Sequence, residues 1–384
     1  MLTYIIYGGM LIGGTLLASI AQRTNQKRWI FLIVLILSLI AGGRALSVGK
    51  DTQAYAKIFL DVYSLGADKA YGEIGFTLFV QSLGIISTNP NFIFFIISLL
   101  TNTFIIYRLW DFHEISDFTI IVFCYCSSFY LPTLNIIRQP LAVSFVFYMS
   151  RYLKSDNYLL FLASILLAAF FHITALLGLI YFAVEMLIHR KKLILWVKKN
   201  RRLFLKISCI VGAIGILGII LIWDQLIALY NRTLSGGISI NIGLMLPLKI
   251  LFLFGSLFLV TFYNPKDKDL NLYFQYIKQH NVGFEKRCNN TLQRNISTFR
   301  TIPKIITLFY LIGLLLAFSG YVMPFASRIS MMFYLYEAVY FGWLIKKGES
   351  PIFLCFIALL LGYIFIDSIS GNGHGIFPYL FFWQ

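Results

Sequence analysis

The amino-acid sequence predicts an all-α polytopic integral membrane protein with about 11–13 transmembrane or re-entrant helices. The 384 residues are 59% hydrophobic and only 12% charged, whereas soluble domains carry about 25% charged residues. Aromatic residues account for 17% of the chain, and long apolar runs recur from one end to the other. A chain of this composition is expected to place its helices in lipid.

Apolar segments follow one another along the chain, and several are shorter than the roughly 20 residues that a straight span needs. They lie at residues 2–22, 29–44, 74–87, 91–107, 118–131, 135–151, 158–171, 173–188, 204–223, 244–263, 304–320, 328–345 and 351–368. The first run lacks a basic n-region, so it does not read as a cleavable signal. The block 158–188 is too long for one ordinary span, and we expect it to divide near His172. We expect one domain over residues 1–384.

The orientation in the membrane follows from the lysine and arginine residues of the loops, which favour the cytoplasmic side. The basic loops are residues 23–28, 151–154, 189–203, 264–304 and 346–347. The net charge of +16 is then mostly a positive-inside signature, together with attraction to anionic membrane lipid. The basic residues flank spans and form no single patch, which argues against binding of nucleic acid.

This orientation places the N-terminus outside and makes residues 45–72 an outer loop, with residues 225–243 on the same side. One conflict remains. Residues 74–107 contain two apolar runs, but the charges require an odd number of crossings between 45–72 and 108–117. Either 74–87 is re-entrant or 55–66 adds a partial span.

Cysteine and metal-ligand patterns indicate neither a disulfide framework nor a metal centre. The cysteines are Cys124, Cys126, Cys209, Cys288 and Cys355. The Cys-x-Cys at 124–126 has no second pair, and no HExxH or paired Cys/His ligand set is present. We therefore expect packing cysteines, no metal and no cofactor.

Ten polar residues lie on the predicted outer side of the membrane, away from the basic cytoplasmic loops. These residues are Arg44, Asp51, Thr52, Tyr55, Glu73, Asn135, Arg138, Gln139, His172 and Arg328. They are spread over almost the whole chain, but the topology brings them to one membrane face. Asn135, Arg138 and Gln139 have the i, i+3, i+4 spacing of residues on one face of a helix.

Several of these residues also have a structural interpretation. Arg44 and Arg328 could extend from helix ends to the membrane interface. Glu73 could favour a helix N-terminus through the helix dipole. His172 could be a hydrogen-bonded structural histidine, and Asp51 a solvated loop residue. Arg138 is harder to explain in this way, because it lies about one turn inside an expected helix and charge within a membrane is costly.

Three outer arginines with carboxylates and a histidine suit a lipid diphosphate. A guanidinium group holds phosphate through two parallel hydrogen bonds and stays charged when partly dehydrated. Asp51, Glu73 or His172 could then act as a base on an incoming hydroxyl group while the diphosphate leaves. The residues alone do not choose among these three.

The order of these motifs resembles the EpsG family, Wzy-like polymerases of bacterial exopolysaccharide and capsule assembly. The matching motifs are Arg-x4-Gly-x-Asp-Thr-x2-Tyr from Arg44 to Tyr55, Glu-x-Gly-Phe from Glu73, Asn-x2-Arg-Gln from Asn135, His-x-Thr-Ala from His172, and the late Arg328. The resemblance covers roughly residues 30–190 well and the later part only through Arg328.

The resemblance implies a glycosyltransferase that joins oligosaccharide repeat units carried on undecaprenyl diphosphate, at the outer face of the bacterial cytoplasmic membrane. It implies Asp51, Glu73 and His172 as catalytic candidates and the remaining outer residues as substrate-binding candidates. A lipid-linked donor and acceptor are the expected partners, and the flippase and chain-length regulator of the same pathway are candidate partners.

Two other classes of membrane protein remain as alternatives. A flippase or exporter of lipid-linked glycans would need ionisable residues at middle depth in several spans, and Glu337 and Asp367 are the main residues of that kind. A membrane O-acyltransferase would use His172, but it leaves three outer arginines unexplained.

Overall fold

The computed structural model describes residues 1–65, 73–154, 157–189, 305–317, 324–346, 351–371 and 373–383. These residues form helices and no named strand, with one isolated bridge between Arg44 and Phe381. The all-α prediction is therefore confirmed. The chain divides into a first unit, Met1–Tyr181, Ile302–Leu315 and Ile329–Gln384, and a second unit, Phe182–Thr301 and Leu316–Arg328.

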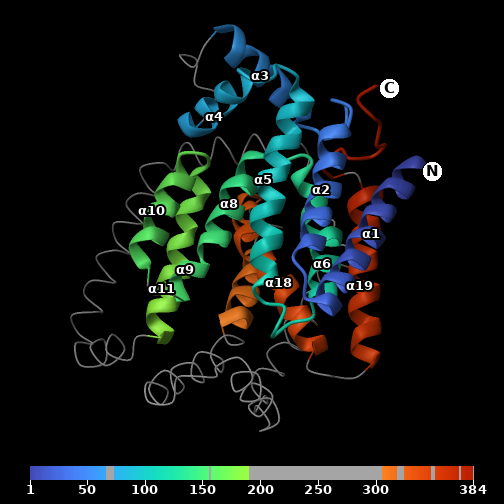
Figure 1. Ribbon diagram of the computed structural model, residues 1–384, viewed down its shortest axis with the longest axis vertical. Helices are drawn as coiled ribbons and strands as arrows, with labels where there is room; N and C mark the ends of the chain where they lie inside the picture. Colours follow the sequence, from blue (N-terminus) through green and yellow to red (C-terminus); the bar gives the residue numbers. More distant parts are fainter. Residues whose placement is uncertain are drawn as a thin grey trace. The chain divides into compact units, whose positions relative to one another are not determined.

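The helices follow the predicted apolar segments closely in most places (Figure 1). They are α1 Leu2–Thr24, α2 Arg28–Gly43, α3 Thr52–Leu65, α4 Ile74–Gly84, α5 Pro90–Trp110, α6 Phe118–Cys124, η1 Tyr125–Tyr130, α7 Leu131–Thr133, α8 Arg138–Met149, α9 Arg151–Lys154, α10 Tyr158–Ala169, η2 Ile173–Leu177, α11 Gly178–His189, α18 Pro324–Lys346 and α19 Pro351–Ser370. Residues Ile305–Ala317 are also helical. The expected segments 204–223 and 244–263, and the loops 225–243 and 264–304, lie outside the described residues.

Among the residues that the structure describes, two helices, α1 and α5, are long and apolar enough to cross a membrane. The outward side of α1 carries Ile5, Ile12 and Leu16, which are all more than half exposed, while Tyr7 and Ala18 are buried. Large apolar side chains exposed in this way along a whole helix are unfavourable in water and favourable in lipid. Helix α1 therefore has the surface of a membrane protein.

Small residues let the helices of the first unit approach one another closely. Helix α2 packs against α1 and α5, and α5 also packs against α8. A Cβ atom on Gly42 would lie 2.6 Å from the Cβ of Phe95, so only glycine fits where α2 meets α5. The free thiols of Cys124 and Cys126 are buried, as expected of packing cysteines.

The segment expected as an outer loop at 45–72 contains helix α3, and α3 packs against α4. Helices of 14 and 11 residues are about 21 and 17 Å long, too short for a bilayer core of about 30 Å. Figure 1 shows α3 and α4 together beyond the first residues of α5. Helix α5 alone among the three has the length of a span. The number of membrane crossings in this region stays a prediction.

The expected helix 135–151 begins later than predicted, at Arg138. Pro140 explains the difference, because proline has no N–H group and its ring clashes with the carbonyl group four residues earlier in a helix. Within the first turn no such hydrogen bond is needed. The prediction that Asn135 shares a helix face with Arg138 and Gln139 is therefore wrong, as is the prediction that Arg138 lies one turn inside the helix. The predicted division of 158–188 near His172 is confirmed.

Candidate functional site

Helix α4 starts against the turn that follows α10, and this contact brings Glu73 to His172. The Gly75 N–H group donates a hydrogen bond to the Phe170 carbonyl oxygen at 3.0 Å. A Cβ atom on Gly75 would lie 2.7 Å from that oxygen, so a larger residue would push the two segments apart. Glu73 is the N-cap residue of α4, but its side chain makes no capping hydrogen bond. Its carboxylate is directed to other partners.

The Glu73 carboxylate lies between Arg138 and His172. Its Oε2 atom accepts from Arg138 Nη1 at 2.9 Å, and its Oε1 atom lies 3.9 Å from His172 Nε2. Between 21% and 26% of each side chain is exposed, so all three reach the surface. Arg138 is the first residue of α8, where the positive end of the helix dipole disfavours a cation. The Glu73 carboxylate compensates for that charge.

The hydrogen bond that His172 Nδ1 accepts determines which ring nitrogen carries the proton. His172 Nδ1 accepts from the Thr174 backbone N–H at 3.3 Å and lies 2.8 Å from the Thr174 hydroxyl oxygen. A nitrogen that accepts a hydrogen bond carries no proton, so we assign the neutral ring a proton on Nε2. That N–H group faces Glu73. His172 thus caps the turn at Ile173–Leu177 with one ring nitrogen and faces Glu73 with the other.

Asp51 lies at the start of α3 and is held by Asn135. The Asp51 backbone N–H donates to Asn135 Oδ1 at 2.7 Å, and Asn135 Nδ2 donates to an Asp51 carboxylate oxygen over a longer 3.4 Å. The turn before Asp51 uses Gly49 at φ 98°, a left-handed conformation that favours glycine. The carboxylate itself belongs to an exposed residue.

The segment from Asn135 to Arg138 joins the two parts of the site. Asn135 holds Asp51, and Arg138, three residues later, holds Glu73. The Arg138 guanidinium carbon also lies 5.8 Å from the ring centres of Tyr55 and Phe76. Those rings belong to the buried apolar cluster beneath α3 and α4. We call Asp51, Glu73, Asn135, Arg138 and His172 the Asp51–Glu73 site.

Other predicted site residues take positions inside the protein or outside this site. Thr52 is fully buried and its hydroxyl group donates to the Val48 carbonyl oxygen at 2.7 Å, which closes the loop before α3. Gln139 and Arg44 are also buried. The Arg44 guanidinium donates to the Ala41 carbonyl oxygen and lies over the Phe94 ring at 4.4 Å. Arg328 is exposed and belongs to the second unit, so its part in the site stays a prediction.

The comparisons with known protein families decide the family. The EpsG family matches residues 27–381, nearly the whole chain. The chain belongs to the EpsG family. No curated protein and no solved structure matches it.

EpsG is a family of Wzy-like polymerases, so membership connects the protein with polysaccharide assembly. The resemblance predicted from the motif order is confirmed, and the match extends it well beyond residues 30–190. Residues 30–190 contain all five members of the Asp51–Glu73 site.

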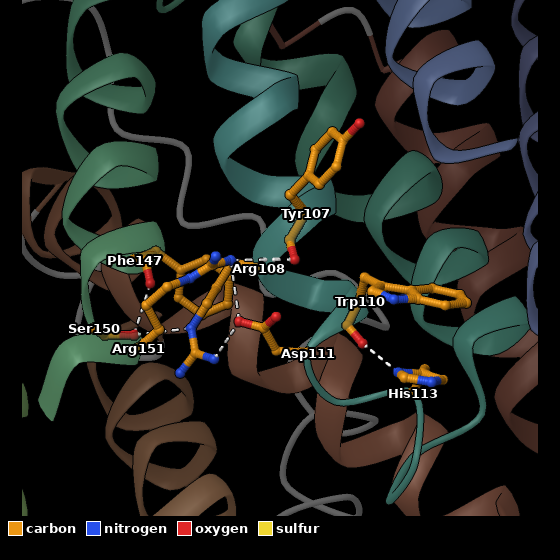
Figure 2. Close-up of polar contacts among 8 residues, drawn as sticks. All are labelled: Tyr107, Arg108, Trp110, Asp111, His113, Phe147, Ser150 and Arg151. Carbon is orange, nitrogen blue, oxygen red and sulfur yellow. Dashed lines mark hydrogen bonds and ion pairs between the residues drawn. The ribbon is translucent and has the colours of Figure 1, made fainter. Parts of the chain in front are cut away.

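The EpsG-family chain has a second polar cluster, at the opposite end of α5, which sequence reasoning missed. Arg108 and Arg151 both contact one Asp111 carboxylate oxygen, at 3.0 and 3.1 Å. Arg108 Nε donates to the Ser150 hydroxyl group at 3.1 Å. Figure 2 shows Asp111 beside both guanidinium groups. We call these four residues the Arg108 cluster. The cluster joins residues 108–117 to 151–154, both predicted to be cytoplasmic.

Proposed function

We propose that this EpsG-family protein joins oligosaccharide repeat units carried on undecaprenyl diphosphate, at the outer face of the bacterial cytoplasmic membrane. In this reaction a hydroxyl oxygen of the acceptor sugar attacks the anomeric carbon of the donor. The bond from that carbon to the diphosphate oxygen breaks, and the diphosphate leaves with the electron pair. The hydroxyl proton passes to a base on the protein.

The observation that carries the proposal is the meeting of Glu73, Arg138 and His172, together with Asn135, which holds Asp51 and lies three residues before Arg138. Four separate segments supply these residues, and their side chains reach the surface. The arginine provides a planar fork for phosphate oxygens. The carboxylates and the histidine provide groups that accept or donate protons. Such a combination suits a substrate that carries both a diphosphate and a nucleophilic hydroxyl group.

We assign the base to Asp51. Each oxygen of Glu73 already faces a donor, Arg138 on one side and His172 on the other. The Asp51 carboxylate has one long contact with Asn135 and lies on an exposed residue. It is therefore the carboxylate best placed to take a proton from an incoming hydroxyl group.

His172 has the role of a donor in this scheme. Its Nδ1 atom accepts from Thr174, so the proton lies on Nε2, which faces Glu73 and in this scheme donates to a negatively charged oxygen of the bound diphosphate. When the diphosphate binds Arg138, it competes with Glu73 for the guanidinium group, and the imidazole N–H stabilises the negative charge that develops on the leaving group. No step of this scheme requires a metal ion or a cofactor.

The proposed membrane arrangement is multi-pass, with about 11–13 transmembrane or re-entrant helices and the N-terminus outside. Helix α5 runs from the end near the Asp51–Glu73 site, where the Asn91 side chain donates to the Arg44 carbonyl oxygen, to the Arg108 cluster. Its length suits one crossing of the bilayer. The proposed partners are a lipid-linked donor, a lipid-linked acceptor and surrounding membrane lipid, with the pathway's flippase and chain-length regulator nearby.

Deletion of the gene and analysis of the lipid-linked glycans test the proposed function. We expect single repeat units on the lipid carrier, exposed to the outside of the membrane, in place of polymer. Complementation with the intact gene should restore polymer. Single units retained on the cytoplasmic side would indicate a flippase instead. Polymer of normal length that lacks acyl groups would indicate an O-acyltransferase.

A further inference from the structure

The last described residues, 373–383, run antiparallel beside the loop that leads to Asp51. The Gly49 N–H group donates to the Gly375 carbonyl oxygen at 2.7 Å, and the Lys50 N–H group donates to the His374 carbonyl oxygen at 3.0 Å. Farther along, the Ala45 N–H donates to the Leu380 oxygen at 2.8 Å. We call residues 373–383 the C-terminal strap.

The strap is anchored to two helices of the first unit. The Tyr379 hydroxyl group donates to the Ile40 carbonyl oxygen of α2 at 2.8 Å, and the Tyr379 backbone N–H donates to the Thr3 hydroxyl oxygen of α1 at 3.0 Å. The Tyr7 hydroxyl group of α1 donates to the Ile376 carbonyl oxygen at 3.0 Å. Tyr7 and Tyr379 are buried and meet edge to face. These contacts fix the strap independently of the loop.

Arg44 joins this anchor from the loop side. Its backbone forms the isolated bridge with Phe381, and its buried guanidinium interacts electrostatically with Tyr7, Tyr130 and Tyr379. Arg44 as a whole is 1% exposed. A charge at this depth suits a structural anchor better than a group that binds substrate directly.

The strap and the loop approach each other most closely at Gly375 and Gly49, directly before Asp51. Gly375 has φ 68° and Gly49 has φ 98°, a region that other residues adopt at a cost. A Cβ atom on Gly375 would lie 2.9 Å from the Lys50 backbone nitrogen. The next residue is Asp51, whose N–H group is bound by Asn135. The backbone that carries the Asp51 carboxylate is thus held from both sides.

We propose that the C-terminal strap positions Asp51 for the transfer reaction, with Gly375 as the positioning residue at the crossing. This inference rests on the proposed function, because it takes Asp51 as the base. It adds a part of the site that lies more than 300 residues from Asp51 in the sequence. An error of about 1 Å in the position of a reacting group is enough to lower a rate about a hundredfold.

The test compares Gly375→Ala with Gly373→Ala in the full-length protein. A Cβ atom on Gly373 would meet no atom within 4 Å, and Gly373 belongs to the same segment, so it serves as the matched control. Backbone hydrogen exchange of residues 44–51 reports whether the loop is held. The rate of polymer formation from isolated lipid-linked repeat units, measured over a range of substrate concentrations, gives kcat and KM separately.

For Gly375→Ala we expect faster exchange in residues 44–51 and kcat lowered by about tenfold or more. We expect KM to stay within about threefold, because Arg138 is unchanged, and the Gly373→Ala protein to match the wild type in all three quantities. Unchanged exchange in Gly375→Ala, or faster exchange with an unchanged kcat, would overturn the inference.

A second variant covers the case in which Gly375→Ala fails to insert. Tyr379→Phe keeps the ring and removes one hydrogen bond to α2, and we expect the same pattern at a smaller size, with kcat lowered about threefold. A Tyr379→Phe protein with normal exchange and normal kcat would count against the inference. Failure of the wild-type protein to make polymer would reject the proposed function, whereas an active wild type beside an equally active Gly375→Ala variant rejects this inference alone.

Discussion

Two arginine–carboxylate pairs of the first unit lie in different settings, one at the last residues of α5 and the other at the starts of α8 and α4. In the Arg108 cluster, Arg108 and Asp111 are three residues apart, the Arg108 side chain is 4% exposed, and a second arginine shares the carboxylate. In the Asp51–Glu73 site, Arg138 and Glu73 are 65 residues apart and about a quarter exposed. The first pair closes a helix end. The second is assembled by the fold and reaches the surface.

The difference lies in the surroundings of each arginine. Arg108 donates to Ser150 and to Asp111 and lies 4.6 Å from the Phe112 ring. These partners belong to the C-terminal ends of α5 and α8. Arg138 is the first residue of α8 and pairs with Glu73, whose other carboxylate oxygen faces His172 Nε2. An arginine–carboxylate pair therefore indicates a binding site only when the arginine side chain is exposed enough for a ligand to reach it.

The largest expected difference is between two carboxylates. Asp51→Asn should lower polymer formation by roughly 10²–10⁴-fold, because the amide cannot take the proton of the incoming hydroxyl group. Asp111→Asn should leave polymer per inserted protein close to normal. Both are measured as polymer in a deletion strain, normalised to the protein in the membrane. Equal losses of polymer in the two variants would remove the distinction between the Asp51–Glu73 site and the Arg108 cluster.

The next difference is between two arginines. Arg138→Lys keeps the charge but loses the planar fork, and we expect polymer to fall about tenfold to a hundredfold, the loss of a hydrogen bond to a charged group. Arg108→Lys should instead lower the free energy of unfolding, by about 1–3 kcal/mol, because lysine cannot reach Ser150 and Asp111 together. Thermal unfolding in detergent and polymer per inserted protein separate the two effects. Near-normal polymer from Arg138→Lys would argue against diphosphate binding at that residue.

A smaller effect is expected from His172→Asn, which separates the two nitrogens of the ring. The asparagine oxygen takes the place of Nδ1 and accepts from Thr174, so the turn should keep its cap. The N–H group directed at Glu73 is lost, and we expect about tenfold less polymer from a normally inserted protein. The amount in the membrane and the amount of polymer are both measured. Full activity would return His172 to a purely structural role.

The smallest effect is a pH dependence of the strap. Burial, and then the charge of Lys50, lower the pKa of His374, while Asp51 acts in the opposite direction. The docked strap therefore binds fewer protons than a released one, and docking strengthens as pH rises. We expect the protection of residues 44–51 from hydrogen exchange to weaken as pH falls below about 6.5. His374→Gln should remove this dependence, and a pH profile unchanged by that substitution would contradict the assignment.

Much of the fold could be predicted from the sequence, because apolar runs and turn residues are local signals. The division at His172 and the positions of α1, α5 and α19 follow from such signals. The start of α8 was predicted three residues too early, at 135, because the effect of Pro140 on where the helix begins was not taken into account. Helix α3 was expected only as one of two alternatives, a partial span at 55–66, because it lies within a mostly polar segment.

The candidate site was only partly predictable. Topology grouped Asp51, Glu73, Arg138 and His172 on one membrane face. The structure brings the last three together and connects Asp51 to them through Asn135. Arg44 does not join these residues, because it is buried beside Tyr7 and Tyr379. No sequence pattern indicates this burial. The strap was missed because its hydrogen bonds to the loop before Asp51 join backbone groups, and its side-chain anchors, Tyr7 and Tyr379, are more than 300 residues apart in the sequence.

The most direct test of the central claim uses the purified full-length protein in lipid vesicles with isolated undecaprenyl diphosphate-linked repeat units. We predict a ladder of products that differ by one repeat unit, with one undecaprenyl diphosphate released per bond formed, and neither product from Asp51→Asn. The same ladder from Asp51→Asn, or no ladder from an inserted wild-type protein, would contradict the account.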